Sequence, residues 1–105
     1  MKDNNFAQEI EECAGETIRG IVISASRSGY SWDKEENNEN ANKVLTWRKA
    51  KPLLSYSYDA GYGGQDCHSI YAWTDNWVVL VSEYDGSTCV VRVPRNPVDC
   101  KPESI

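Results

Sequence analysis

The single histidine of the chain, His68, is the side chain best suited to acid–base chemistry, because imidazole titrates near neutral pH. Two tight turns in the sequence that follows predict that His68 lies across from Glu83 in a sheet, where a carboxylate could orient a general base. Cys67 is adjacent in sequence, but neighbours on a regular strand point to opposite faces, so the pair is unsuited to nucleophilic catalysis. The pattern favours a structural cross-strand pair, and a hydrolase centred on His68 is the alternative.

Residues 59–66 form a glycine-rich segment with Gly61, Gly63 and Gly64, and glycines let a backbone approach a phosphate closely. The segment has no lysine, and a strand rather than a helix is expected after it, so it does not match a phosphate-binding loop. A connection between strands is favoured. A protein that binds a small ligand or a nucleotide signal through this Gly/Tyr loop is the alternative.

Metal ligands of the usual spacing are missing from the sequence. The four cysteines contain no C-x-x-C pair, so a zinc site that includes His68 is disfavoured. Asp59 and Asp66 flank the glycine-rich segment without the spacing of a calcium loop. We therefore expect neither a metal ion nor a cofactor.

The charge of the chain indicates which partners suit it. The net charge is −5, and residues 59–85 contain acids but no Lys or Arg, so direct nucleic-acid binding is not expected. Four Trp and six Tyr against one Phe are typical of surfaces that meet a partner, although small β-rich domains also use them in strands. We predict a protein partner with a basic surface. The predicted contact residues are Asp59, Tyr62, Asp66, Trp77, Glu83, Asp85, Tyr30 and Trp32.

Two turn signals predict the elements that position these residues. Asp85-Gly86 is typical of a two-residue hairpin turn, and Asp75-Asn76 is a second, weaker signal, so three strands should form a meander. Alternation along the strands then defines two faces. The predicted core face holds Tyr71, Trp73, Val78, Leu80, Val91 and Val93. The other face, which needs a cover from the chain or from a partner, holds Ile70, Ala72, Val79, Val81, Val90 and Arg92, with Trp77 at one end.

The remaining elements follow from periodicity and from Gly and Pro. Residues 3–14 have an apolar stripe typical of a helix, which Gly15 should end. Residues 17–26 predict a strand, in which Gly20 indicates a bulge or a close backbone approach. Residues 27–42 predict a long polar loop. Residues 43–48 and 53–58 predict two strands, or one bent strand, with a break at Pro52.

These expectations combine into one α+β domain over residues 1–105, with an N-terminal helix packed on a twisted antiparallel sheet of four to six strands. The N-terminus lacks the apolar core of a signal peptide, and no apolar run reaches membrane-spanning length. We therefore expect a cytoplasmic protein with no membrane contact and reduced cysteines.

Several motifs resemble small hypothetical proteins of bacteriophage and bacterial genomes, over about the C-terminal half. They are Tyr58-Asp59-Ala60-Gly61-Tyr62-Gly63, Asp66-Cys67-His68, Tyr71-Ala72-Trp73-Thr74, Tyr84-Asp85-Gly86 and Pro94-Arg95-Asn96-Pro97. The resemblance implies a context in which small acidic proteins block host machinery. Because the sequence offers no credible catalytic set and is acidic and rich in Tyr and Trp, we expect a non-enzymatic binding protein. In this context it would be an inhibitor of a host or defence protein, for example a CRISPR protein, in the host cytoplasm.

Overall fold

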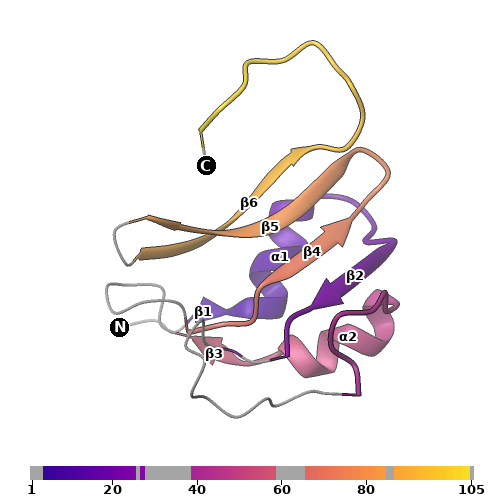
Figure 1. Ribbon diagram of the computed structural model, residues 1–105, viewed down its shortest axis with the longest axis vertical. Helices are drawn as coiled ribbons and strands as arrows, with labels where there is room; N and C mark the ends of the chain where they lie inside the picture. The colour runs from indigo at the N-terminus through magenta and orange to yellow at the C-terminus, as the bar shows by residue number, and fades with distance from the viewer. Residues whose placement is uncertain (1–3, 26, 28–38, 59–65, 85–86, 105) are drawn as a thin grey trace.

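The computed structural model describes residues 4–25, 27, 39–58, 66–84 and 87–104. The fold is α+β, as predicted. Its elements follow one another along the chain as β1 (Asn4–Asn5), α1 (Phe6–Ala14), β2 (Gly20–Ile23), α2 (Trp47–Leu54), β3 (Ser57–Tyr58), β4 (Ile70–Trp73), β5 (Trp77–Tyr84) and β6 (Ser87–Pro94) (Figure 1).

The main sheet is antiparallel with the strand order β2-β4-β5-β6, and β1 pairs with β3 in a separate two-stranded sheet. The predicted meander of β4, β5 and β6 is confirmed. Tyr71 pairs with Leu80, and Leu80 pairs with Val91, as the two turn signals predicted. The pairing of Tyr84 with Ser87 also agrees with a two-residue connection.

The prediction of which face forms the core was wrong. Ala72 and Val79 are fully buried, whereas Tyr71, predicted to be in the core, is 57% exposed. Helix α1 packs on the Ala72 and Val79 side, so in Figure 1 the sheet lies in front of this helix. Ala72 has a short side chain that lets a helix approach, and α1 supplies Phe6 and Ile10 to the same core.

Helix α1 begins at Phe6, later than predicted, because Asn5 caps it and belongs to β1. The Asn5 side chain accepts a hydrogen bond of 3.0 Å from the Gln8 backbone N–H. Gly15 ends the helix as predicted: its φ is 67°, and its N–H donates to the Glu11 carbonyl at 3.1 Å.

Helix α2 corrects the prediction of strands at residues 43–48 and 53–58, of which only β3 is a strand. Thr46 Oγ1 caps α2 by accepting from the Lys49 N–H at 3.2 Å. Ala50 and Leu54 lie one turn apart and are buried, as on one face of a helix. Pro52 lies inside the helix and does not break it, although the Arg48 carbonyl thereby lacks the N–H of residue 52 as a donor.

Strand β2 is shorter than the predicted strand at 17–26. Gly20 is a point of close approach, as predicted, because a Cβ there would lie 3.3 Å from Val44 Cγ1. Most of the predicted loop at 27–42, including Tyr30 and Trp32, lies outside the described residues. Within the described ranges, neither helix has the length and apolar character needed to cross a membrane.

Candidate functional site

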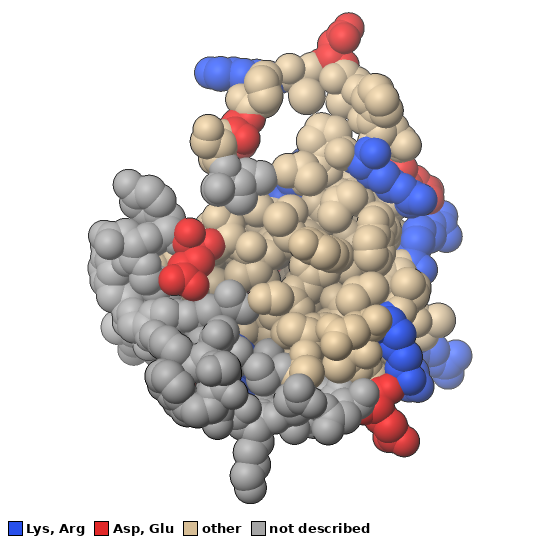
Figure 2. Space-filling view, viewed as in Figure 1, with Lys and Arg blue, Asp and Glu red and all other residues tan. Residues whose placement is uncertain are grey.

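The face of the sheet opposite α1 is apolar and partly exposed. We call it the open sheet face and define it by the side chains of Val22, Tyr71, Trp73, Val78, Leu80, Val91 and Val93. Apart from Tyr71, which is more exposed, these side chains are half-buried. The whole face lacks a charged residue, and Figure 2, in the view of Figure 1, shows a broad area without Lys, Arg, Asp or Glu over the strands.

Strand pairing arranges the open sheet face in two rows. One row runs across the sheet through four consecutive partners, which are Val22, Tyr71, Leu80 and Val91. The second row contains Trp73, Val78 and Val93 and ends at Gly20. Gly20 has no side chain, and the exposed Val44 side chain lies against the position that a Cβ would occupy there. Tyr71 and Trp73 meet edge to face with ring centres 6.4 Å apart.

A shallow cavity of about 320 Å³ adjoins the first row. It is lined by Val22, Tyr71 and Leu80 on the apolar side and by Ser24 and Ser69 on the polar side. The open sheet face is therefore slightly hollowed between β2 and β5, which gives an apolar side chain of another molecule a place to insert.

The turn between β4 and β5 is held by ionic contacts at one end of the open sheet face. Arg19 Nε lies 3.1 Å from Asp75 Oδ1, and Glu16 accepts hydrogen bonds from the Thr74 hydroxyl and from the Asn76 N–H. These hydrogen bonds lower the pKa of Glu16, and the Arg19 guanidinium lowers the pKa of Asp75. These charged side chains lie at one end of the open sheet face, and their contacts stabilise the turn between β4 and β5.

His68 is buried rather than displayed. It is 5% exposed, its Nδ1 lies 2.8 Å from Tyr56 Oη, and its backbone N–H donates to the same oxygen. Burial, together with the nearby Arg27 charge, lowers the pKa of His68 to about 4. The predicted pairing of His68 with Glu83 was wrong, because β4 begins only at Ile70 and the ladder does not reach His68.

Cys67 is also buried, and this corrects the argument that Cys67 and His68 point to opposite faces: the two residues precede β4 and do not alternate as in a strand. Burial raises the pKa of the Cys67 thiol to about 12, so it is protonated at neutral pH and a poor nucleophile. Cys89 is exposed, and all four cysteines are free thiols.

Side chains from α1, β3 and β6 also contribute buried polar atoms. Glu9 Oε2 accepts a hydrogen bond of 2.8 Å from Tyr58 Oη, and burial together with this contact raises the pKa of Tyr58. Glu9 Oε1 and Thr88 Oγ1 are buried without a hydrogen-bond partner among the described residues. The residues that the structure describes contain no group of three or more His, Cys, Asp or Glu placed to hold a metal.

The predicted contact residues are only partly described. Asp66 is exposed, with Oδ2 3.8 Å from Arg27, and Glu83 is exposed at the end of β5. Trp77 is half-buried on the α1 side, where the Arg92 guanidinium carbon stacks 3.9 Å from its ring centre. The others lie outside the described residues: Asp59, Tyr62, Asp85, Tyr30 and Trp32.

Sequence reasoning missed Tyr71 and its neighbours as surface residues. A signal was present, since both faces of the meander are apolar and one of them carries Tyr71 and Trp73, whose amphipathic rings suit a partly exposed surface. Most of the net negative charge lies on residues outside the described ranges, among them Asp33, Glu35 and Glu36. Comparison of the chain with protein-family models, with curated proteins and with solved structures finds no match.

Proposed function

We propose that this protein is a non-enzymatic binding protein whose open sheet face contacts a partner protein. The observation that carries the proposal is the row Val22, Tyr71, Leu80 and Val91, which leaves apolar side chains partly exposed across every strand of the sheet. Contiguous apolar patches on a protein surface are typical of sites of protein contact. Single exposed apolar residues would not support the same inference.

A hydrolase centred on His68 has less support from the geometry. A general base must reach the proton that it abstracts, and His68 is enclosed and bonded to Tyr56. With the pKa of its imidazole near 4 and that of the Cys67 thiol near 12, neither group is poised for proton transfer at neutral pH.

The sequence resemblance suggests the role of such a binding protein: an inhibitor that covers a surface of a host or defence protein. Asp66 and Glu83 are exposed near one end of the sheet, where they could meet basic groups of the partner around an apolar contact. In this arrangement the apolar rows supply most of the affinity, and the acids contribute to orientation.

The test compares partner capture by two variants that gain the same charge. Tyr71→Asp places a carboxylate in the open sheet face, and Leu53→Asp places one at an exposed apolar side chain of α2. Tagged wild type and both variants are used to capture proteins from an extract of the presumed host, with identification by mass spectrometry. We expect a specific protein with wild type and Leu53→Asp that is lost with Tyr71→Asp, since a buried unpaired charge is costly.

Circular dichroism and thermal unfolding should show that both variants fold. If Tyr71→Asp folds and captures the same protein as wild type, the open sheet face is not the contact surface.

A further inference from the structure

Strand β6 forms a free edge of the main sheet. In the described part of the chain, it is the last strand in the order and pairs with β5 alone. The Arg95 N–H donates to the Asn76 carbonyl, and hydrogen-bonded pairs alternate along an antiparallel ladder. The backbone groups of Val91 and Val93 therefore face β5, whereas the N–H and carbonyl of Arg92 face outward. Pro94 also occupies an outward position, where its missing N–H costs no ladder bond.

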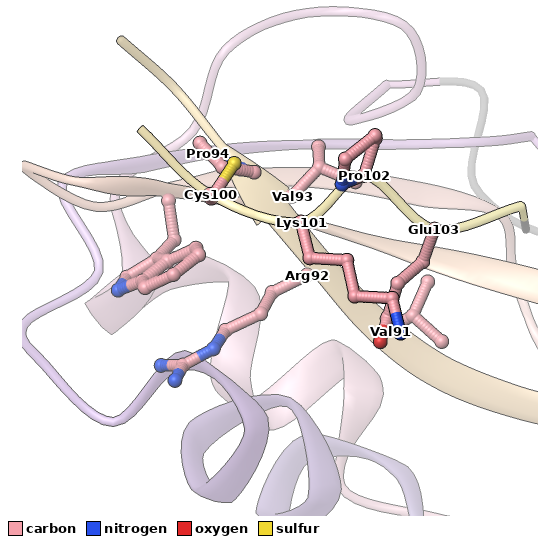
Figure 3. Close-up of a pocket in the computed structure, with 9 residues that line it drawn as sticks. Val91, Arg92, Val93, Pro94, Cys100, Lys101, Pro102 and Glu103 are labelled. Carbon is pink, nitrogen blue, oxygen red and sulfur yellow. The ribbon is translucent and has the colours of Figure 1, made fainter. Parts of the chain in front are cut away.

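A cavity of about 610 Å³ lies along this edge (Figure 3). Val91 and Val93 belong to the open sheet face, and Arg92 and Trp77 belong to the α1 side, yet all of them line the cavity. Because residues of both faces line it, the cavity follows the edge of the strand. Its outer wall is the C-terminal tail, with Lys101 and Pro102, and we call this space the edge slot.

The tail stands away from the sheet. Its first residues are tied to the β4–β5 turn, since Arg95 Nη1 donates to the Thr74 carbonyl at 2.8 Å and Asn96 Nδ2 to the Asp75 carbonyl at 3.2 Å. The described residues after them are exposed, and the tail arches away from β6 in Figure 1. Nearer the start of β6, the outward Val90 carbonyl already has a hydrogen-bond partner, because the Cys13 thiol of α1 donates to it at 3.7 Å.

The open sheet face alone is small for a stable complex. Four strands spaced about 4.8 Å apart, over four to six residues of about 3.3 Å, cover roughly 250–400 Å². A stable protein–protein interface buries about 800 Å² on each partner. The edge slot supplies additional area directly beside the face, because Val91 and Val93 belong to both.

We propose that an extended segment of the partner protein enters the edge slot and adds to the sheet as a further strand beside β6. This inference rests on the proposed function and specifies how the partner is held. The segment pairs its backbone with the outward N–H and carbonyl of Arg92 and packs apolar side chains, at alternate positions, against Val91 and Val93. A second copy of the chain suits the slot less, because each copy has a charge of −5 and its tail contains Pro97 and Pro102, which lack an N–H.

Two variants of one residue separate backbone pairing from side-chain effects. Arg92→Ala and Arg92→Pro both remove the guanidinium that stacks on Trp77, but only Arg92→Pro removes the outward N–H. The probe is a synthetic peptide selected for binding to the full-length chain from a displayed library of random linear peptides. We expect Arg92→Pro to bind the peptide about tenfold more weakly than Arg92→Ala, the effect of losing one well-made hydrogen bond. Equal affinities would overturn the proposal, as would a library that yields no binder.

Hydrogen exchange of the wild-type chain gives a second measurement, which decides the question if Arg92→Pro does not fold. The Arg92 amide should exchange at least about tenfold more slowly with the peptide bound. Slower exchange at amides of the strands that form the open sheet face, without slower exchange at Arg92, would overturn the edge proposal and leave the proposed function in place. Protection of Arg92, combined with unchanged partner capture by Tyr71→Asp, would support the slot as a peptide site and overturn the proposed function.

Discussion

At the scale of single residues, His68 shows how an environment can remove a side chain from chemistry. Its imidazole is buried against Tyr56, whose hydroxyl also accepts the His68 backbone N–H. The Arg27 guanidinium stacks on the Tyr56 ring, with its central carbon 3.9 Å from the ring centre. A positive charge on His68 would lack water and lie near Arg27, so the neutral form is favoured.

This environment makes stability depend on pH in a defined range. The pKa of His68 is about 4 in the folded chain and 6.5 for an ordinary histidine, so the unfolded chain binds the proton more readily between these values. Stability is then fully present above pH 6.5 and falls as the pH drops toward 4, by up to about 3 kcal/mol. Urea unfolding of wild type and His68→Gln at several pH values measures how much of this loss of stability comes from His68. The loss between pH 6.5 and 4 should be smaller in His68→Gln, and equal losses would contradict the assignment.

At the scale of elements, the turns determined the register but could not decide which face is buried. The pairing of Leu80 with Val91 follows from turn chemistry, which is local. Burial of Val79 instead of Leu80 depends on where α1 docks, and both faces offered apolar side chains. Helix α2 was missed for a related reason: Pro52 suggested a break, although Thr46 and the spacing of Ala50 and Leu54 are helical signals.

Two neighbouring residues of β5 test the assignment of faces. Val79 is fully buried under α1, and Leu80 is half-buried on the open sheet face. Val79→Ala should reduce the free energy of unfolding by about 2 kcal/mol, because it leaves a cavity in the core. Leu80→Ala removes more atoms but should cost only about 1 kcal/mol, since water already reaches part of the site. Chemical denaturation gives both values, and a larger cost for Leu80→Ala would reverse the faces.

At the scale of the whole molecule, the charges are separated from the open sheet face. Charged side chains lie around the uncharged area over the strands in Figure 2. The sequence predicted an acidic contact surface for a basic partner, whereas the open sheet face offers contact without charge. The two arrangements differ in how salt acts on association, because screening weakens charge steering and leaves apolar contact intact.

A salt series with the captured partner distinguishes them. As salt rises from 0.1 M to 1 M, the Debye length falls from about 10 Å to about 3 Å. For contact mainly through the open sheet face, with Asp66 and Glu83 only near one end of the sheet, we expect the association rate to change less than about threefold over this range. Biolayer interferometry with wild type and Asp66→Lys provides the rates. A steep fall with salt, accompanied by slower association of Asp66→Lys, would favour the acidic surface.

The strand order also determines when each part of the chain can fold. The β5–β6 hairpin joins neighbouring segments, and hairpins form in about 1–10 μs. Strand β2 must wait for β4, as shown by Ser24 and Ser69, which are hydrogen bonded although 45 residues apart in sequence. Ribosomes add about 5–20 residues per second, so the apolar residues of α1 and β2 spend seconds without their partners during synthesis. Strand β4 supplies the pairing partner of β2, and β5 and β6, which are made later still, supply the packing partners of α1. Chaperones that bind nascent chains have those seconds in which to act.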